Sequence, residues 1–479
     1  MSRLVVVSNR VSLPTERAQR AGGLAVAIRE ALERTGGMWF GWSGETPDAP
    51  SAQATRVTRG KVEYALIDLA PAEFEGFYNG YANSTLWPLF HYRLGLVKFQ
   101  RADFRTYLAV NARFAAALAP LLKADDVIWI HDYQLLPLAG ELRKLGVANR
   151  IGFFLHIPLP GIDTLAVLPG LGTLMRGLAG ADLIGFQTAR DLQNFRDFVR
   201  QEASGTIGMD GLVTCFDRRL EAGAFPIGID AANFTALAEK AVAKPDCRQL
   251  LQSLGSRKLM IAIDRLDYSK GIPQRFEACE ELLRGHPEHR GGVDLVQIAS
   301  PSRSEVASYR DLRREIDRLS GRINSAFSDL NWTPIRYLAR TYPRPALAGF
   351  CRLARVGLVT PLRDGMNLVA KEYVAAQDPA DPGVLVLSRF AGAAAQLTSA
   401  LIVNPYDVDQ CAEAMHRALT MPLDERKQRW RAAMHVVERS DVRAWWTSFT
   451  TRLRNGRGNG SGNGSGTAPS RPGVLVPSD

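Results

Sequence analysis

The chain has 479 residues, of which 46% are hydrophobic and 23% charged, and its formal net charge is +10. This composition is ordinary for globular proteins and excludes a disordered or fibrous chain, while the length predicts at least two domains. The sequence contains neither the ~20 uninterrupted apolar residues of a membrane span nor a block of five or more like charges. We therefore expect no membrane span and no nucleic-acid partner.

Apolar, β-branched runs alternate with segments of helical period, which is the pattern of parallel sheets with crossover helices. Because these runs are unbroken, we expect their strands to be buried on both faces. One helix is predicted over 24–32, where Leu24, Ile28 and Leu32 recur at a spacing of four. In chain order the predicted strands are 4–8, 127–130, 151–156, 183–186, 259–263, 295–299, 356–360, 384–387 and 401–403.

This pattern predicts an α/β fold with two doubly wound domains that face each other across a cleft. The halves meet near Asp230, so we assign residues 1–230 to the first domain and 231–440 to the second. Ligands of such sheets bind at the carboxyl ends of the strands. The Gly/Asn/Ser/Pro-rich tail over 455–479 cannot bury apolar surface and is predicted to be disordered.

The first predicted strand ends at Ser8-Asn9-Arg10, and the paired glycines Gly22 and Gly23 open the next helix. Paired glycines at a helix N-terminus let backbone N–H groups approach a phosphate. A flexible loop with a helix cap explains the pair equally well. The pair is not the GxGxxG of a nicotinamide site, which disfavours a dehydrogenase.

Arg265 and Lys270 follow a strong predicted strand and precede a helix, so we place them at the carboxyl end of that strand. Two cations at this position can neutralise a diphosphate whose charge grows as it leaves. A solvated surface loop with Asp–Arg pairs is the alternative, and the position at a strand end disfavours it.

A second segment between a strand and a helix carries Asp364, whose carboxylate can accept hydrogen bonds from sugar hydroxyls. The backbone N–H groups of residues 365–368 offer an anion-binding nest, and Glu372 can accept from ribose hydroxyls. Alternatively, Asp364 is an N-cap of the helix.

His131-Asp132 and His156 each end an apolar strand in the first half, and the segment over 78–87 mixes aromatic and amide side chains. Sugar faces require such mixtures, although a partly buried loop would also contain them. Asp407-Val408-Asp409 matches a DxD metal motif, but its place before a helix is better explained by N-capping. We therefore expect no metal site.

Together these segments resemble the trehalose-6-phosphate synthases, a family of retaining glucosyltransferases with two Rossmann-like domains in the glycosyltransferase-B architecture. The resemblance extends from Met1 to about Leu453. Its motifs, in family order, are Ser8-Asn9-Arg10, Ala21-Gly22-Gly23-Leu24, Leu86-Trp87-Pro88, Trp129-Ile130-His131-Asp132-Tyr133, Phe154-Leu155-His156-Ile157-Pro158, Arg265-Leu266-Asp267-Tyr268-Ser269-Lys270-Gly271 and Arg363-Asp364-Gly365-Met366-Asn367-Leu368.

The resemblance implies UDP-glucose as donor, glucose 6-phosphate as acceptor, trehalose 6-phosphate as product and no cofactor. It also implies that a helix over 441–454 crosses back onto the first domain. The implied acceptor-binding residues are Arg10, Tyr78, Trp87, Asp132 and Arg303. The implied donor-binding residues are Gly22, Gly23, Arg265, Lys270, Tyr342, Asp364, Leu368, Val369, Ala370, Lys371 and Glu372. The implied catalytic residues are Asp132, His156, Arg265, Lys270 and Asp364, with His156 touching the transferred glucose.

Three positions depart from the commoner family pattern. Gly161-Ile162-Asp163 replaces a loop that usually carries Ser or Thr and then Glu, and Tyr342 stands where Phe is expected. Asp264 precedes Arg265, and we expect its negative charge to reduce the positive electrostatic potential at that arginine.

By the same resemblance, the reaction is a front-face attack in which the departing diphosphate takes the proton of the acceptor hydroxyl. A silent sugar-phosphate sensor is a rival, which the intact Arg265, Lys270 and Asp364 disfavour. Another rival is a transferase of the same fold with another acceptor, such as a glucosylglycerol-phosphate synthase or a pseudoglycosyltransferase.

The five scattered cysteines, without a CxxC spacing, and the missing secretory signal lead us to expect a cytoplasmic protein. The preferred nucleotide and the oligomeric state stay open, a homo-oligomer included.

Overall fold

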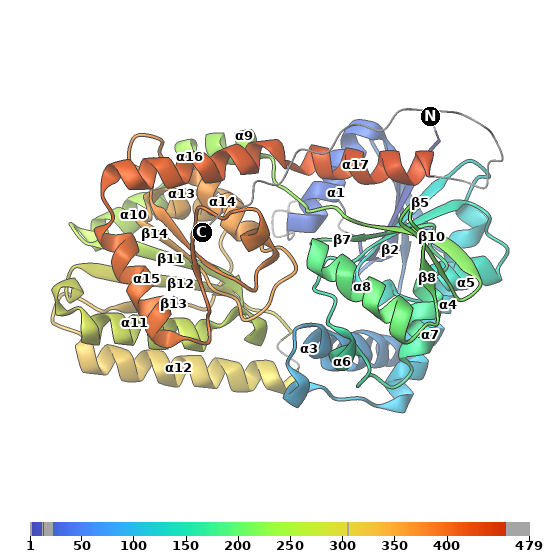
Figure 1. The fold of residues 1–479 in the computed structure, drawn as a ribbon, viewed down its shortest axis with the longest axis horizontal. Coiled ribbons are helices and arrows are strands. Elements are labelled where there is room, and N and C mark those ends of the chain that lie inside the picture. The colour runs from blue at the N-terminus through green and yellow to red at the C-terminus, as the bar shows by residue number, and fades with distance from the viewer. Residues whose placement is uncertain (1, 12, 14–22, 304–305, 457–479) are drawn as a thin grey trace, which may run out of the picture.

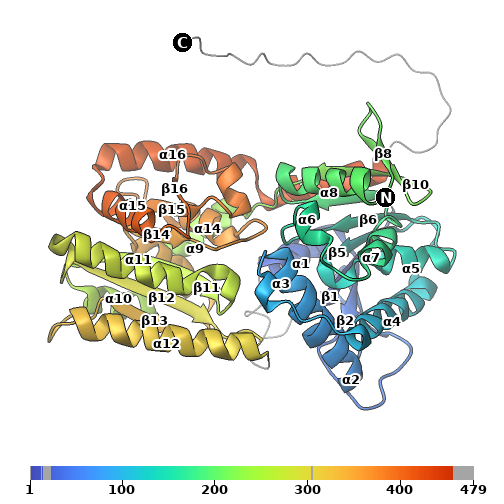
Figure 2. The same ribbon diagram turned by 60° about the horizontal axis from the view of Figure 1, so that its bottom comes forward.

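The computed structural model describes residues 2–11, 13, 23–303 and 306–456. Two α/β lobes lie side by side, each built around one sheet (Figure 1, Figure 2). The predicted fold class is therefore confirmed. Gly22 and residues 457–479, most of the predicted tail, lie outside the described residues.

The N-terminal lobe surrounds a ten-stranded sheet whose central strands are parallel. The central strands β5 (Val127–His131) and β7 (Leu183–Phe186) are buried along their whole length, as their unbroken apolar sequences predict. The strands lie in the order β3 (Thr55–Arg59), β4 (Val62–Ile67), β2 (Gly37–Trp42), β1 (Leu4–Arg10), β5 (Val127–His131), β6 (Arg150–Phe154), β7 (Leu183–Phe186), β10 (Arg218–Ala224), β9 (Leu212–Cys215) and β8 (Thr206–Ile207).

The helices of this lobe cover both faces of the sheet (Figure 2). The aromatic segment over 78–87, for which the sequence predicted no helix, lies in the π-helical η2 and the start of α3. The helices are α1 (Gly23–Thr35), α2 (Pro71–Phe74), η2 (Glu75–Leu86), α3 (Trp87–Phe90), η3 (Leu94–Leu96), α4 (Arg101–Leu118), η4 (Ala119–Leu121), η5 (Tyr133–Leu135), α5 (Leu138–Lys144), α6 (Ile162–Leu165), α7 (Leu171–Leu178) and α8 (Ala189–Gln201).

The C-terminal lobe surrounds a six-stranded sheet in which every paired neighbour is parallel. The chain builds outward from β11 to one side and from β14 to the other, so the strand order reverses between these two strands. Ligands of open α/β sheets bind at such a switch point, at the carboxyl ends. The order is β13 (Ile335–Leu338), β12 (Val293–Ser300), β11 (Lys258–Arg265), β14 (Val356–Val359), β15 (Val384–Ser388) and β16 (Leu401–Val403).

Helices enclose this second sheet, and α12 runs along its edge beside α11 (Figure 1). They are α9 (Ala231–Ala241), α10 (Pro245–Leu254), η6 (Tyr268–Lys270), α11 (Ile272–Gly285), η7 (Pro287–His289), α12 (Ala307–Phe327), α13 (Arg344–Leu353), α14 (Leu368–Ala376), η8 (Gly392–Ala395), α15 (Val408–Thr420), α16 (Leu423–Arg439) and α17 (Val442–Asn455).

The last helix, α17, leaves the end of α16 and lies on the sheet of the N-terminal lobe (Figure 1). The ring of Phe449 stacks on Trp129 at a centroid distance of 4.6 Å, and Trp445 lies 5.0 Å from the same indole. A Cβ at Gly152 would lie 2.7 Å from Leu453 Cδ2, so the strand needs a glycine for the helix to come this close. The helix thus ties the end of the second lobe to the core of the first.

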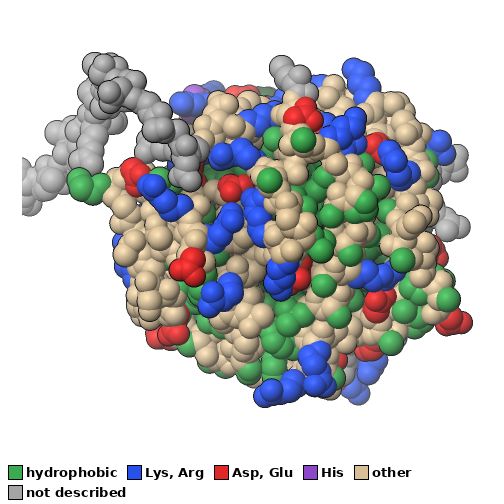
Figure 3. Space-filling model, turned by 90° about the vertical axis from the view of Figure 1, so that its right-hand side faces the viewer, with side chains coloured by type: hydrophobic (Ala, Val, Ile, Leu, Met, Phe, Trp, Pro, Cys, Tyr) green, Lys and Arg blue, Asp and Glu red, His purple; other side chains and the backbone are tan. Residues whose placement is uncertain are grey.

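One face of the N-terminal lobe shows basic, acidic and apolar side chains together. Figure 3 shows the outer face of the N-terminal lobe, where Lys and Arg are interspersed with acidic and apolar side chains and form no continuous patch. Within the described residues, no helix combines the length and the apolar character that a membrane crossing requires.

Candidate active site

A buried ion pair marks the switch point of the C-terminal sheet. Lys270, in η6 after β11, donates from Nζ to Asp364 Oδ2 over 2.5 Å, and Asn367 Nδ2 donates to the same oxygen over 3.0 Å. Burial acts to raise the pKa of Asp364, but the Lys270 charge outweighs it, so the pKa is lowered and the carboxylate is ionised. The N-cap alternative for Asp364 is wrong, because Asn367 holds the cap position of α14.

Asp267, which sequence reasoning did not select, is the fully buried centre of this region. It accepts hydrogen bonds from Trp87 Nε1 at 3.4 Å and Tyr309 Oη at 3.0 Å, and the Arg303 guanidinium lies 3.6 Å away. Burial acts to raise its pKa, but the surrounding cations, Arg303 first, outweigh burial and lower the pKa to about 2. Asp267 is therefore a permanent negative charge that holds these groups in place.

Trp87 and Arg303, two of the predicted acceptor residues, meet across the two lobes. The Arg303 guanidinium lies 3.9 Å from the centroid of the Trp87 indole, and its Nη2 donates to Tyr133 Oη over 3.0 Å. The Arg265 guanidinium lies 5.3 Å from the centroid of the same indole, and Arg265 is exposed. The predicted acceptor and diphosphate groups therefore share one aromatic platform.

Arg10 and Tyr78 form a separate group at the end of β1. The exposed Arg10 guanidinium lies 5.6 Å from the centroid of Trp42, and the ring of Tyr78 lies 6.2 Å from the same indole while it stacks on Phe74. In the part of the chain that the structure describes, no contact joins Arg10 to Arg303. The predicted acceptor residues thus fall into two groups that only a ligand would join.

Asp132 and His156 follow β5 and β6, the latter ending at Phe154 rather than at the predicted 156. Asp132 adopts a left-handed backbone with φ of 77°, and its Oδ1 accepts from the His156 backbone N–H at 3.2 Å. Burial raises the pKa of Asp132 to about 6, against the opposing effect of backbone hydrogen bonds and two arginines. The carboxylate is therefore ionised at neutral pH and poised close to its titration.

The His156 imidazole is neutral and already hydrogen-bonded on both sides. Its Nε2 lies 3.0 Å from His131 Nδ1, and its Nδ1 lies 3.3 Å from Gln187 Nε2, while burial lowers its pKa to about 3. It is therefore not a proton acceptor at neutral pH. A Cβ at Gly365 would lie 2.0 Å from the His156 carbonyl oxygen, which shows how closely the second lobe approaches here.

The predicted donor segment forms the first turns of α14. The side chain of its lysine, Lys371, makes a structural hydrogen bond within the protein. Lys371 Nζ donates to the carbonyl oxygen of Ile227 over 2.7 Å, and burial lowers its pKa to about 8. Any contact of this residue with the donor is therefore left to the backbone. Burial raises the pKa of Glu372 to about 7, and Arg344 lies 3.8 Å from its carboxylate.

The remaining donor assignments are spread more widely. Tyr342 is half-buried, packs edge-on against Phe350 at 5.3 Å and has the Arg340 guanidinium 4.4 Å from its ring centroid. Leu368 and Val369 are half-buried and Ala370 is buried. Gly23 is the first residue of α1, whereas its predicted partner Gly22 lies outside the described residues.

The structure also settles the local surroundings of three unusual segments. Asp264 is bound to the buried Arg275 at 2.6 Å, so its charge is directed to that residue instead of tempering Arg265. The Gly161 N–H donates to Tyr92 Oη at 2.9 Å. This hydrogen bond fixes the start of the loop over 161–163, whose sequence differs from the commoner family pattern. Asp407 accepts from the Gln410 N–H and caps α15, as predicted.

Two doubly wound lobes with a charged, aromatic site at the switch point define a nucleotide-sugar glycosyltransferase. The sequence profile of glycosyltransferase family 20 matches residues 2–455, and the chain belongs to this family.

The relatives share both sequence and structure with this chain. A trehalose-6-phosphate synthase of Sinorhizobium fredii is 50% identical, over 95% of this chain and 98% of its own length. The structure of an α,α-trehalose-phosphate synthase (UDP-forming) from Burkholderia xenovorans in complex with glucose-6-phosphate superposes with a TM-score of 0.91 at 49% identity, over 95% of this chain and 100% of that one. An Escherichia coli structure bound with UDP-2-fluoro glucose gives a TM-score of 0.90 at 48% identity, over 95% and 99%.

Proposed function

We propose that this chain is an α,α-trehalose-phosphate synthase, which transfers glucose from UDP-glucose to glucose 6-phosphate with retention and releases UDP. The observation that carries the proposal is the junction of Trp87, Arg303 and Asp267, because it joins the predicted acceptor lobe to the predicted donor lobe. The similarity over 95% of the chain to synthases of this activity supports the same substrates.

Arg265 and Lys270 supply the counter-charge for the departing UDP. Arg265 is exposed and available for a phosphate, whereas Lys270 is held by Asp364 in one orientation. Preorganised cations of this kind stabilise charge that develops on a leaving group without the cost of rearranging water. Asp364 then has two tasks, since it orients Lys270 and presents its second oxygen toward the donor sugar.

On the acceptor side, Asp132 accepts a hydrogen bond from a glucose hydroxyl, and Arg10 with Tyr78 contacts the phosphate. The raised pKa of Asp132 keeps its carboxylate ionised only above about pH 6. An acceptor that spans from Arg10 to Trp87 would join the two groups of residues and favour closure of the lobes, which excludes water that would hydrolyse the donor.

Retention is best explained by attack on the same face from which UDP leaves. Both ring nitrogens of His156 are engaged and its pKa is depressed to about 3, so this imidazole is not the base. As the family resemblance implies, the acceptor proton is taken by an oxygen of the departing diphosphate. A new C–O bond forms at the anomeric carbon while the bond to UDP breaks.

We further propose that the protein works in the cytoplasm on small molecules alone, without nucleic acid. All five cysteines are free and buried, which suits a reducing compartment.

The test is a matrix of UDP-, ADP- and GDP-glucose against glucose 6-phosphate, glycerol phosphate and free glucose, with product mass and anomeric configuration as readouts. We expect one major product, α,α-trehalose 6-phosphate, and stoichiometric UDP. A major product with another acceptor would replace the proposal with the related transferase activity. Binding without any UDP release would indicate a sensor instead.

A further inference from the structure

A cluster of histidines and glutamates lies at the edge of the C-terminal sheet opposite the active site. His286-Pro287-Glu288-His289 follows the end of α11, and Glu413 and His416 come from the last two turns of α15. Lys258, the first residue of β11, donates from Nζ to the carbonyl oxygen of Leu419 at 2.9 Å, which fixes α15 at this edge. Arg265, at the other end of β11, belongs to the active site.

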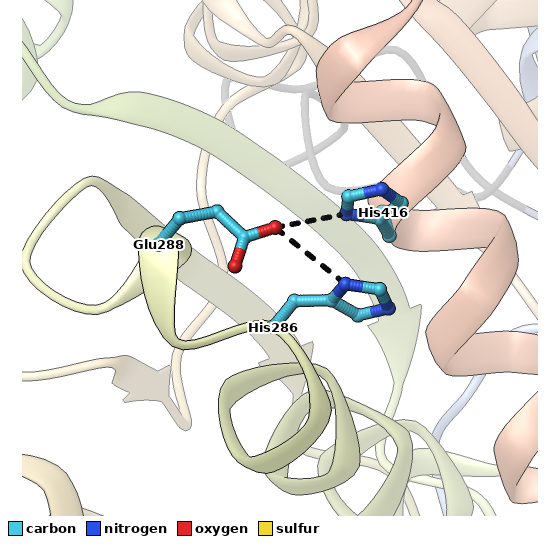
Figure 4. A group of neighbouring side chains, drawn as sticks. All are labelled: His286, Glu288 and His416. Carbon is cyan, nitrogen blue, oxygen red and sulfur yellow. Dashed lines mark ion pairs between the residues drawn. The ribbon is translucent and has the colours of Figure 1, made fainter.

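Three side chains in this cluster have the spacing of metal ligands (Figure 4). Glu288 Oε1 lies 3.5 Å from His286 Nδ1 and 3.7 Å from His416 Nδ1, and the three ligand atoms all lie within 4.8 Å of one another. A tetrahedral metal with bonds of ~2.0–2.2 Å separates its ligand atoms by roughly 3.3–3.6 Å. The separations of Glu288 Oε1 from the two Nδ1 atoms are therefore close to those of a metal site.

A second carboxylate sets the orientation of one imidazole. Glu413 Oε1 lies 2.8 Å from His286 Nε2, and a carboxylate can only accept, so Nε2 carries the proton. The lone pair of His286 is then on Nδ1, the atom that faces Glu288. A carboxylate that fixes the outer nitrogen of a histidine is the usual support of a metal ligand.

The two ligand imidazoles stack face to face and must part to bind one ion, because the lone pair of each Nδ1 lies in the plane of its ring. The rings of His286 and His416 stack with centroids 3.7 Å apart and an angle of 11° between their planes. His289 Nε2 lies 3.0 Å from His416 Nδ1, so metal binding would replace this hydrogen bond between the two imidazoles. The side chains of His286 and His416 are 20% and 27% exposed, so a metal ion can enter from solvent.

We propose that His286, Glu288 and His416 bind a divalent transition metal such as Zn²⁺, which clamps the end of α11 to α15. Two imidazoles and one carboxylate match Zn²⁺, Co²⁺ or Ni²⁺, whereas Mg²⁺ and Ca²⁺ require more oxygen ligands. The site lies at the opposite edge of the sheet from Lys270 and Asp364, so the metal stabilises the lobe and takes no part in glucose transfer.

The test uses the full chain without an affinity tag, stripped of metal with EDTA. Zn²⁺ binding is measured by calorimetry, Co²⁺ binding by its visible absorption, and Tm is recorded with and without Zn²⁺. The variants are His286→Ala, His416→Ala and Glu288→Gln, the last of which leaves both rings in place. His435→Ala removes an exposed histidine of α16 and is the matched control.

We expect one Zn²⁺ per chain in the wild type, a tetrahedral Co²⁺ spectrum and a Tm that rises with Zn²⁺. Each of the three variants should weaken binding by at least ~10-fold and abolish the rise in Tm, whereas His435→Ala should not. Turnover should be unchanged throughout. No binding by the wild type would overturn the proposal, as would equal affinities in the wild type and Glu288→Gln, or an equal loss in His435→Ala.

Discussion

At the scale of single residues, Arg265 and Lys270 are the cations that we propose meet the charge of the departing UDP. We expect Arg265→Ala and Lys270→Ala each to lower kcat/KM by ~10²–10³, the usual loss for one preorganised electrostatic group. Steady-state kinetics with both substrates provides the measurement. Arg431→Ala, which removes an exposed arginine of α16, should leave the kinetics unchanged. Near-native turnover of a correctly folded Lys270→Ala would show that the diphosphate is bound elsewhere.

Asp267 gives a prediction about stability and pH. Its pKa is lowered from 3.8 to about 2 in the folded chain. A depressed carboxyl pKa contributes stability above the unfolded value of 3.8, and this contribution is lost as the pH falls through 2. The shift corresponds to about 2 kcal/mol. The free energy of unfolding of Asp267→Asn should therefore approach that of the wild type between pH ~4 and ~2.

Urea unfolding of both proteins across this pH range provides the measurement. The exposed Asp246→Asn is the control and should show no such convergence. A stability difference between wild type and Asp267→Asn that stays constant down to pH ~2 would mean that the carboxylate is not held by its cations.

The residues at strand ends were predictable, whereas the residue that organises them was not. Arg265, Lys270 and Asp364 follow apolar strands, so their position at the carboxyl edge could be predicted from the sequence. Asp267 lies in the same motif, but its function depends on Trp87, 180 residues away along the chain. The cluster of His286 and His416 could not be predicted for the same reason, because a contact between segments distant in the sequence has no local sequence signal.

At the scale of elements, the predicted strands were those with unbroken apolar sequences. All nine predicted ranges overlap strands of the two sheets. The sequence did not predict β2, which begins at a glycine and carries two tryptophans, or the edge strand β3, in which four of five residues are polar. It likewise missed β4, β8, β9, β10 and the short edge strand β13. It also gave no sign of η2, since the spacing of a π-helix does not match the 3.6-residue period.

The helix α17 supplies a prediction about how the lobes are held together. Phe449 is fully buried against Trp129, Phe154 and Phe225. We expect Phe449→Ala to lower the free energy of unfolding by about 3–5 kcal/mol, because the large cavity forms between a helix and a sheet that cannot easily collapse. Denaturant unfolding provides the measurement.

The matched control for this helix is Thr447→Ala, which changes an exposed position two residues away. It should shift the unfolding free energy by no more than ~0.5 kcal/mol. If Phe449→Ala behaved like Thr447→Ala, the packing of α17 on the first lobe would contribute little to stability.

At the scale of the whole molecule, two carboxylates at the junction of the lobes, Asp364 and Asp267, are already paired with protein cations. Asp364 is bound to Lys270, and Asp267 lies against Arg303, so neither is available for Mg²⁺. We therefore expect glucose transfer to proceed in EDTA at the rate seen without it. Activity that disappears with EDTA and returns with Mg²⁺ or Mn²⁺ would contradict this expectation.

The acceptor phosphate is the group that we expect Arg10 to recognise, and substitution of Arg10 tests this. Arg303 is already committed to Tyr133, Tyr309 and Asp267, whereas Arg10 is exposed beside Trp42 and Tyr78 and can donate two parallel hydrogen bonds to phosphate. Binding energy from the phosphate would then align the acceptor hydroxyl as well as hold the sugar.

Glucose 6-phosphate should therefore exceed free glucose in kcat/KM by several orders of magnitude, and Arg10→Ala should shrink this ratio by damaging the phosphorylated acceptor alone. Arg10→Lys keeps the charge but loses the two parallel donors of the guanidinium. Its ratio of kcat/KM for glucose 6-phosphate to that for glucose should therefore lie between those of the wild type and Arg10→Ala. Kinetics of the three proteins with both acceptors provides the measurement. If Arg10→Ala weakened both acceptors equally, Arg10 would serve closure of the lobes instead of phosphate recognition.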